Sequence, residues 1–170
     1  VGLFIAEHPS AFVNPVRSKV ITRRINTEIV PPVAEKRSRI PDVYSETEIW
    51  FKGNYALVLR AYNDVVAWRY KTRFADTITV TRELLTLGMA AADSVYYGDE
   101  ENFISHSERF YTCRAAGSVK GNQMGILPAV FRKSTGFIAA FTESDLLDYP
   151  GLYLLGSDKA DGTFTGTFPH

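Results

Sequence analysis

The residues best suited to chemistry in this sequence lie between positions 106 and 113, where His106, Glu108 and Cys113 follow one another. A cysteine and a histidine can act as a nucleophile and its base if the two side chains come within hydrogen-bond reach. On a helix, residues two positions apart point about 200° away from each other, because each residue turns the chain by about 100°. We therefore expect His106 to lie on a helix surface, and we predict no catalytic residue in this chain.

Cys113 is the only cysteine, and two interpretations of it stay open. A lone cysteine excludes an internal disulfide framework and a cysteine-rich metal site. Its most ordinary role is that of a small buried hydrophobic side chain. The alternative is a reactive thiol or a point of covalent attachment.

The sequence lacks the common motifs of nucleotide binding, ester hydrolysis and zinc binding. No Gly-x-Gly-x-x-Gly, no phosphate loop ending in Gly-Lys-Ser/Thr and no Gly-x-Ser-x-Gly occurs, nor do two histidines four residues apart. The remaining histidines, His8 and His170, lie in segments that we expect to be arms. The glycine-rich stretch 117–122 has the spacing of a plain loop, and Glu100 and Glu101 are expected to be solvated. We predict no metal site.

Composition places the chain among ordinary globular proteins. It has 170 residues, 45% of them hydrophobic and 22% charged, with a formal net charge of zero. This length predicts one domain with a real core. A neutral chain gives little support to nucleic-acid binding, and no apolar run approaches the roughly 18–20 residues that span a bilayer. The chain begins with Val1 and not with Met, so we expect that a leader was removed or not included.

Residues 1–45 are predicted to form an extended arm. Five prolines interrupt this segment and remove backbone hydrogen-bond donors, which excludes a long helix. Short β-rich runs such as residues 20–22 suit brief pairing as a strand. The arm is basic, and its charge allows two interpretations: a solvated linker, or docking on an acidic partner. The residues expected to dock are Arg17, Lys19, Arg23 and Arg24.

Residues 46–117 are predicted to form a helical core. From residue 46 to residue 75, aromatic and aliphatic side chains recur at helical spacing over most of the circumference, so this helix needs cover on several sides. Ser45 and Glu48 form the capping-box pattern that starts a helix. The apolar anchors expected to bind a partner are Trp50, Tyr62 and Trp68.

Two more helices are predicted, over about residues 79–97 and 103–116, on their apolar spacing. Three helices joined by short turns argue for a small antiparallel bundle. After residue 117, glycine and proline punctuate short apolar pieces, so residues 118–170 are expected to be an irregular, partly β tail. The predicted fold class is therefore mainly α.

One local stretch and the layout of the chain resemble a known family. The stretch Tyr111-Thr112-Cys113-Arg114-Ala115-Ala116-Gly117 places a cysteine and a basic residue near a predicted helix end. It is similar to the environment in which phycobiliproteins and chromophore-bearing γ-type rod linkers hold a bilin by a thioether bond. A proline-rich basic arm, an aromatic helical middle and a glycine-rich tail are similar to the layout of phycobilisome linker subunits.

This resemblance implies a linker that organises acidic antenna proteins for light harvesting in photosynthesis, at the thylakoid surface of a plastid. Cys113 would then carry a covalent bilin, and Arg114 would pair with one of its propionates. We therefore predict a non-catalytic structural subunit that binds other proteins and does not insert into a membrane. Two alternatives stay open: a small enzyme or ligand-binding protein that uses Cys113 and His106, and a ribonucleoprotein subunit that uses the basic arm.

Overall fold

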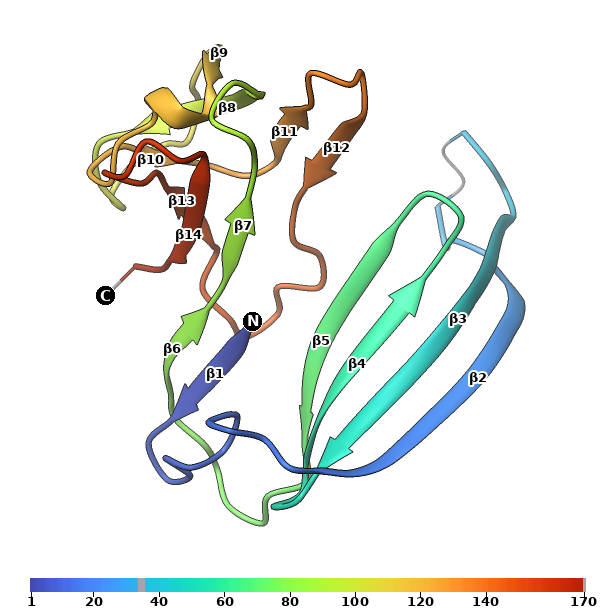
Figure 1. The fold of residues 1–170 in the computed structure, drawn as a ribbon. Helices are drawn as coiled ribbons and strands as arrows, with labels where there is room; N and C mark the ends of the chain where they lie inside the picture. The colour runs from blue at the N-terminus through green and yellow to red at the C-terminus, as the bar shows by residue number, and fades with distance from the viewer. Residues whose placement is uncertain (34–35, 170) are drawn as a thin grey trace. The chain divides into compact units, whose positions relative to one another are not determined.

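The computed structural model describes residues 1–33 and 36–169, which form β-strands, turns and one short 3₁₀ helix (Figure 1). The prediction of a mainly α fold is wrong, since no α-helix occurs in these two ranges. Nothing in the described part of the chain is a helix long and apolar enough to cross a membrane. The elements are β1 (Gly2–Ile5), β2 (Arg17–Ile29), β3 (Ile40–Phe51), β4 (Tyr55–Ala61), β5 (Val66–Thr72), β6 (Val80–Leu84), β7 (Thr86–Gly88), β8 (Ser94–Glu100), β9 (Tyr111–Ala115), η1 (Ala116–Ser118), β10 (Met124–Gly125), β11 (Ala129–Arg132), β12 (Ile138–Phe141), β13 (Tyr153–Leu155) and β14 (Thr163–Thr167).

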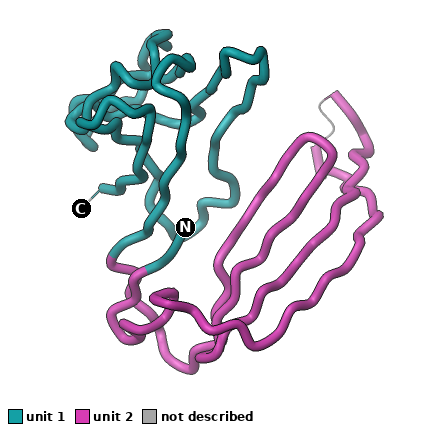
Figure 2. Tube along the Cα trace, viewed as in Figure 1, with its two compact units in different colours: residues 1–3, 82–170 teal, residues 4–81 magenta. Residues whose placement is uncertain are grey.

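The chain divides into two compact units, coloured separately in Figure 2. One unit consists of residues 4–81, and the other of residues 1–3 and 82–170. The boundaries expected after residues 45 and 117 do not coincide with those of the units. β1 pairs with β6, and this two-stranded sheet contains both points at which the chain passes from one unit to the other.

An antiparallel sheet of four strands, in the order β2-β3-β4-β5, forms the unit of residues 4–81. β2 and β3 pair from Arg17 opposite Phe51 to Ile29 opposite Ile40, with one register shift near the start. The β-branched residues of β2 suit a pleated strand. The pairing that we expected to be brief therefore covers most of the basic segment, which is a strand of the sheet and not a free arm.

Two tight turns divide the predicted helix of residues 46–75 into parts of β3, β4 and β5. Gly53 and Asn54 adopt positive φ angles of 99° and 63° between β3 and β4, a conformation that glycine and asparagine tolerate best. The backbone amide of Tyr62 donates to the carbonyl oxygen of Val65 at 2.8 Å and closes the turn between β4 and β5. The apolar side chains that suggested a helix therefore alternate between the two faces of a sheet.

One face of this sheet buries two carboxylates of β3, Glu46 and Glu48, in a network of ion pairs. Arg23 on β2 contacts both of them, with its Nε 2.9 Å from Oε1 of Glu46. Arg60 adds a 2.8 Å contact to Glu46, and Lys71 lies 3.1 Å from Glu48. Burial by itself raises the pKa of Glu46, but the hydrogen bonds and charges of the two arginines outweigh burial and lower that pKa. The hydrogen bond from the Trp50 indole and the contact with Lys71 likewise lower the pKa of Glu48, so both carboxylates are held in the ionised state.

The second unit is built on a larger antiparallel sheet, in the order β12-β11-β8-β10-β13-β14-β7, with β9 paired to β8. Its core includes the buried Val95 of β8, together with Phe131 and Phe164, whose ring centroids lie 5.4 Å apart. The helices predicted over residues 79–97 and 103–116 are wrong. β8 finds its backbone partners in β9, β10 and β11 instead of within its own turn.

The C-terminal segment, residues 118–170, supplies β10 to β14. Its glycines and prolines, which suggested an irregular tail, fall mostly between these short strands or at points of close packing. Of these strands, β10 lies beside β8 at the polar pocket described next.

Candidate functional site

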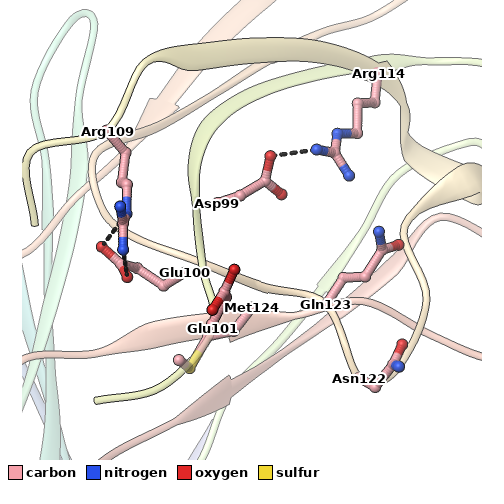
Figure 3. A pocket seen from close by; sticks show the side chains of 8 residues that line it. All are labelled: Asp99, Glu100, Glu101, Arg109, Arg114, Asn122, Gln123 and Met124. Carbon is pink, nitrogen blue, oxygen red and sulfur yellow. Dashed lines mark hydrogen bonds and ion pairs between the residues drawn. The ribbon is translucent and has the colours of Figure 1, made fainter. Parts of the chain in front are cut away.

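A polar pocket of about 540 Å³ lies in the unit of residues 1–3 and 82–170, where β8 ends beside β10 (Figure 3). β8 supplies Asp99 and Glu100, and the antiparallel pairing with β10 places Met124 opposite Glu100. Arg114 on β9 lies opposite Val95 of β8, and its long side chain reaches along the strand to Asp99. The lining residues are Asp99, Glu100, Glu101, Arg109, Arg114, Asn122, Gln123 and Met124.

Glu100 forms a bidentate ion pair with Arg109 at one side of the pocket. The Nε and Nη2 atoms of Arg109 each lie 3.2 Å from a carboxylate oxygen of Glu100, and the Ser105 hydroxyl donates to the same carboxylate at 2.7 Å. Burial raises the pKa of Glu100, but these hydrogen bonds and the charge of Arg109 outweigh it and lower that pKa. Glu100 is therefore a poor proton donor near neutral pH.

Asp99 is held in a second ion pair, with the guanidinium of Arg114. The Thr112 hydroxyl donates to the same Asp99 oxygen at 3.2 Å. Beneath this pair lies the buried ring of Tyr97, and burial, followed by the nearby Asp99 charge, raises the pKa of the Tyr97 hydroxyl to about 12. The Tyr97 ring also occupies the space in which a side chain at Gly125 would stand.

Three lining side chains keep hydrogen-bonding atoms available to a ligand. Among the residues that the structure describes, Glu101 and Asn122 have no side-chain partner. Gln123 accepts the backbone amide of Lys120 at 2.8 Å through its Oε1 atom, which leaves its NH₂ group free. A carboxylate and two amides around ion-paired walls can bind the hydroxyl groups of a polar, uncharged ligand. Within the described ranges, no three His, Cys, Asp or Glu side chains cluster closely enough to hold a metal ion.

The ion pair of Glu100 makes a contribution to stability that depends on pH. Its pKa in the folded chain lies below the ordinary value of 4.5, so the contribution is fully present above that value and is lost as the pH falls through the lowered pKa. We expect the difference in unfolding free energy between the wild type and Glu100→Gln to stay constant between about pH 6 and 8 and to shrink below about pH 4. Urea unfolding over a pH series measures it, and a difference independent of pH would contradict the assignment.

The residues singled out for chemistry are placed differently from expectation. Cys113 is exposed on β9, opposite Tyr96, and is not the buried hydrophobic side chain of the ordinary interpretation. Arg114 lines the pocket, but it pairs with Asp99. His106 lies on an exposed loop and not on a helix, where its Nδ1 accepts the backbone amide of Glu108 at 3.0 Å. No contact brings His106 and Cys113 together in the described part of the chain, and His170 lies outside it.

The basic residues expected to dock on a partner all belong to β2. Arg17, Lys19 and Arg24 are exposed. Arg23, in contrast, is engaged with the two buried glutamates of β3. Docking of a partner on this segment stays a prediction. Arg23 already forms ion pairs with Glu46 and Glu48 of the same sheet.

The expected aromatic anchors lie in three different surroundings. Trp50 is buried, with the guanidinium carbon of Arg73 4.3 Å from the centroid of its ring. Tyr62 donates its hydroxyl to Asp42 at 3.2 Å, and Trp68 is half-buried on β5. Trp50 is thus covered within its own sheet, whereas Trp68 retains exposed surface.

Reasoning from the sequence missed most of the pocket. The run of acidic residues at positions 99–101 was interpreted as solvated charge near a helix start. A usable signal was present in Val95 and Tyr97, two apolar residues two positions apart that are both buried, which is the period of a strand that buries one side. Arg109, Asn122 and Gln123 carried no local signal, because they join the pocket only through the pairing of distant strands.

The chain is similar to a known family over its whole length and to a known enzyme over most of its length. The model of the family described as glycosyl-hydrolase 97 N-terminal matches residues 1–170. A retaining alpha-galactosidase from Bacteroides thetaiotaomicron is 28% identical to this chain over 149 residues. The match covers 82% of this chain and 22% of the relative, so the chain spans about a fifth of the length of the enzyme that it resembles.

Proposed function

Because this chain belongs to the glycosyl-hydrolase 97 N-terminal family, we propose that it is the N-terminal part of a retaining glycosidase that acts on α-galactosides. The activity of the bacterial relative supports this choice of reaction and substrate. Within that enzyme, we assign to this chain the binding of substrate through the polar pocket at the end of β8.

The family membership corrects several expectations. The resemblance to phycobilisome linkers is wrong, and with it the interpretation of the chain as a non-enzymatic, light-harvesting structural subunit. The alternatives of a small enzyme built on Cys113 and His106 and of a ribonucleoprotein subunit are not favoured either. A plastid location is no longer implied. Attachment of a bilin to Cys113 stays untested, and the resemblance on which it depended has been removed.

The ionisation of Glu100 is the reason why we assign the pocket to substrate binding and not to bond cleavage. A retaining glycosidase needs one carboxyl group as an acid and base and a second as a nucleophile. Glu100, with its lowered pKa and its bidentate partner Arg109, is not suited to donate a proton. The free groups of Glu101, Asn122 and Gln123 are instead suited to sugar hydroxyls, and binding energy from such contacts supports catalysis elsewhere in an enzyme.

The proposed reaction is tested on the full-length protein that contains this chain. We expect the full-length protein to hydrolyse an aryl α-galactoside, and the release of the phenol measures the rate. We expect proton NMR to show the α-anomer of galactose as the first product. Turnover of other glycosides without α-galactosides, or a β-anomer formed first, would contradict the proposal.

Substitution of the free pocket carboxylate tests the assignment of substrate binding. We expect Glu101→Gln to raise KM about 5- to 20-fold with little change in kcat. A hydrogen bond to a charged group is worth about 1.5–3 kcal/mol, and the neutral hydrogen bond that glutamine keeps is worth about 0.5–1.5 kcal/mol. The matched control is Asp76→Asn, which removes an exposed carboxylate from the other unit. An unchanged KM for Glu101→Gln, or a fall in kcat alone, would exclude a role in ground-state binding.

A further inference from the structure

The sheet β2-β3-β4-β5 (Figure 1) gathers six cationic side chains on one of its faces. Residues directly opposite each other in an antiparallel sheet point to the same face, as do residues two positions apart on one strand. By this register, Lys19 shares a face with Trp50 and Lys71, and Arg69 lies two positions before Lys71 on β5. The guanidinium of Arg73, which follows β5, lies over the Trp50 ring. We define the basic face by its cations, which are Lys19, Arg23, Arg60, Arg69, Lys71 and Arg73.

The basic face carries more positive charge than its own carboxylates neutralise. Three carboxylates share it, those of Asp42, Glu46 and Glu48. The two glutamates already take three of the six cations as partners. Lys19 and Arg69 are exposed and form no ion pair within the described residues. The whole unit has the same excess, with twelve Lys and Arg against eight Asp and Glu.

The cations of the basic face are spread in rows and do not converge on one point. Side chains two positions apart on a strand lie about 6.5 Å apart, so Arg69, Lys71 and Arg73 follow one another along β5. Lys19 on β2 lies three strand spacings away, which is about 14 Å. A small anion is held by groups that converge on it in a pocket. Separated cations instead match a polymer that carries its negative groups at intervals.

Two aromatic rings of the basic face are covered by its cations. The guanidinium carbon of Arg73 lies 4.3 Å from the ring centroid of Trp50, and that of Arg60 lies 4.4 Å from the ring centroid of Tyr44. Both aromatic side chains are buried. Proteins that bind single-stranded nucleic acid stack its bases on accessible aromatic rings. Because Trp50 and Tyr44 are not accessible in this way, the face recognises its ligand by charge and hydrogen bonding.

We propose that the basic face binds an acidic polysaccharide, whose sugars carry carboxylate or sulfate groups. The choice of a carbohydrate over other polyanions rests on the proposed function, in which the chain is part of a glycosidase. Ammonium and guanidinium groups form charge-assisted hydrogen bonds with these anions, and a guanidinium can donate two parallel ones to a single group. The basic face belongs to residues 4–81 and the polar pocket to the other unit, so the two are separate sites.

Binding of charged and neutral polysaccharides to the full-length protein that contains this chain tests the proposal. We expect dextran sulfate, polygalacturonate or both to bind in biolayer interferometry, and neutral dextran of the same length not to bind. Binding of one charged probe alone identifies sulfate or carboxylate as the recognised group. The affinity is expected to fall about 10- to 30-fold between roughly 50 and 200 mM salt, because a bound polyanion releases its counterions. Binding of neither charged probe, or equal binding of neutral dextran, would overturn the proposal.

Two matched pairs of substitutions locate the binding. We expect Lys19→Gln combined with Arg69→Gln to weaken polyanion binding about 10-fold. The control is Lys159→Gln combined with Arg132→Gln, which removes the same charge from exposed positions of the other unit and is expected to change the affinity less than about 2-fold. All four side chains are exposed, so both variants are expected to keep the thermal midpoint of the wild type. Equal losses for the two pairs would show that net charge alone binds the polymer and would overturn the proposal.

Vesicles of phosphatidylglycerol provide the competing anionic surface. If the full-length protein binds these vesicles and neither charged polysaccharide, and the Lys19 and Arg69 variant loses that binding, the basic face belongs to a membrane contact and the proposal is rejected. The aryl α-galactoside assay is read separately. Turnover without polyanion binding rejects the basic face alone, and polyanion binding without turnover rejects the proposed reaction alone.

Discussion

Replacement of Glu48 by alanine is expected to lower the free energy of unfolding by about 3 kcal/mol. This buried carboxylate accepts the indole N–H of Trp50 at 2.8 Å and pairs with Arg23 and Lys71. Its loss leaves three donors without their acceptor, one of them buried. The estimate is at the low end for a buried ion pair, because the side chains of Arg23 and Lys71 are 48% and 36% exposed and can be partly hydrated.

Tryptophan fluorescence during urea unfolding is a suitable measurement, since Trp50 and Trp68 are the two tryptophans and both lie in the unit of residues 4–81. The control is Glu28→Ala, which removes the exposed pair between Glu28 and Arg39 at the far end of β2 and is expected to cost less than about 0.5 kcal/mol. Equal effects for Glu28→Ala and Glu48→Ala would show that burial of the network adds nothing.

Gly125→Ala is expected to destabilise the unit of residues 1–3 and 82–170 by about 3 kcal/mol or more. A Cβ atom at this position on β10 would stand 2.1 Å from Cδ2 and 2.5 Å from Cε2 of the Tyr97 ring. That ring is buried and carries the ion pair of Asp99 and Arg114 next to it, so it cannot move without a rearrangement of the pocket. We expect the variant to lose sugar binding together with stability.

The same substitution at Gly88 on β7 provides a matched control within this unit. No heavy atom lies within 4 Å of the position that its Cβ would take. Alanine loses less backbone entropy than glycine on folding, so Gly88→Ala is expected to be neutral or stabilising by up to about 1 kcal/mol. Urea unfolding followed by far-ultraviolet circular dichroism compares the two variants. Similar losses at both positions would mean that glycine matters here for the strand and not for the packing against Tyr97.

Local sequence patterns predicted some parts of this molecule well. The prolines of residues 1–45 excluded a long helix, and the β-branched runs in that segment indicated strand pairing, which β2 and β3 form. The lone cysteine excluded an internal disulfide framework. These conclusions depend on properties of single residues or of their nearest neighbours, such as a missing backbone donor.

The predicted helices are wrong because their apolar runs fit the spacing of a buried strand as well as that of a helix. The five consecutive apolar residues of positions 55–59 fit a buried helix as well as a buried strand, and length and periodicity could not separate them. The turns decided the outcome: Gly53 with Asn54, and the bend closed by Tyr62 and Val65, each reverse the chain before a helix of useful length can form. If these turn residues had counted for more than the apolar spacing, the sequence would have predicted strands.

By itself, the sequence determined composition, charge and the positions at which the chain can turn. Only the tertiary structure decided which distant residues meet. Arg23 reaches Glu46 across 23 positions, and Gln123 joins Glu100 in one pocket because β10 pairs with β8. The physical reason is that a strand leaves its backbone donors and acceptors to be satisfied by another strand, so the choice of partner depends on the whole sheet and not on its own residues.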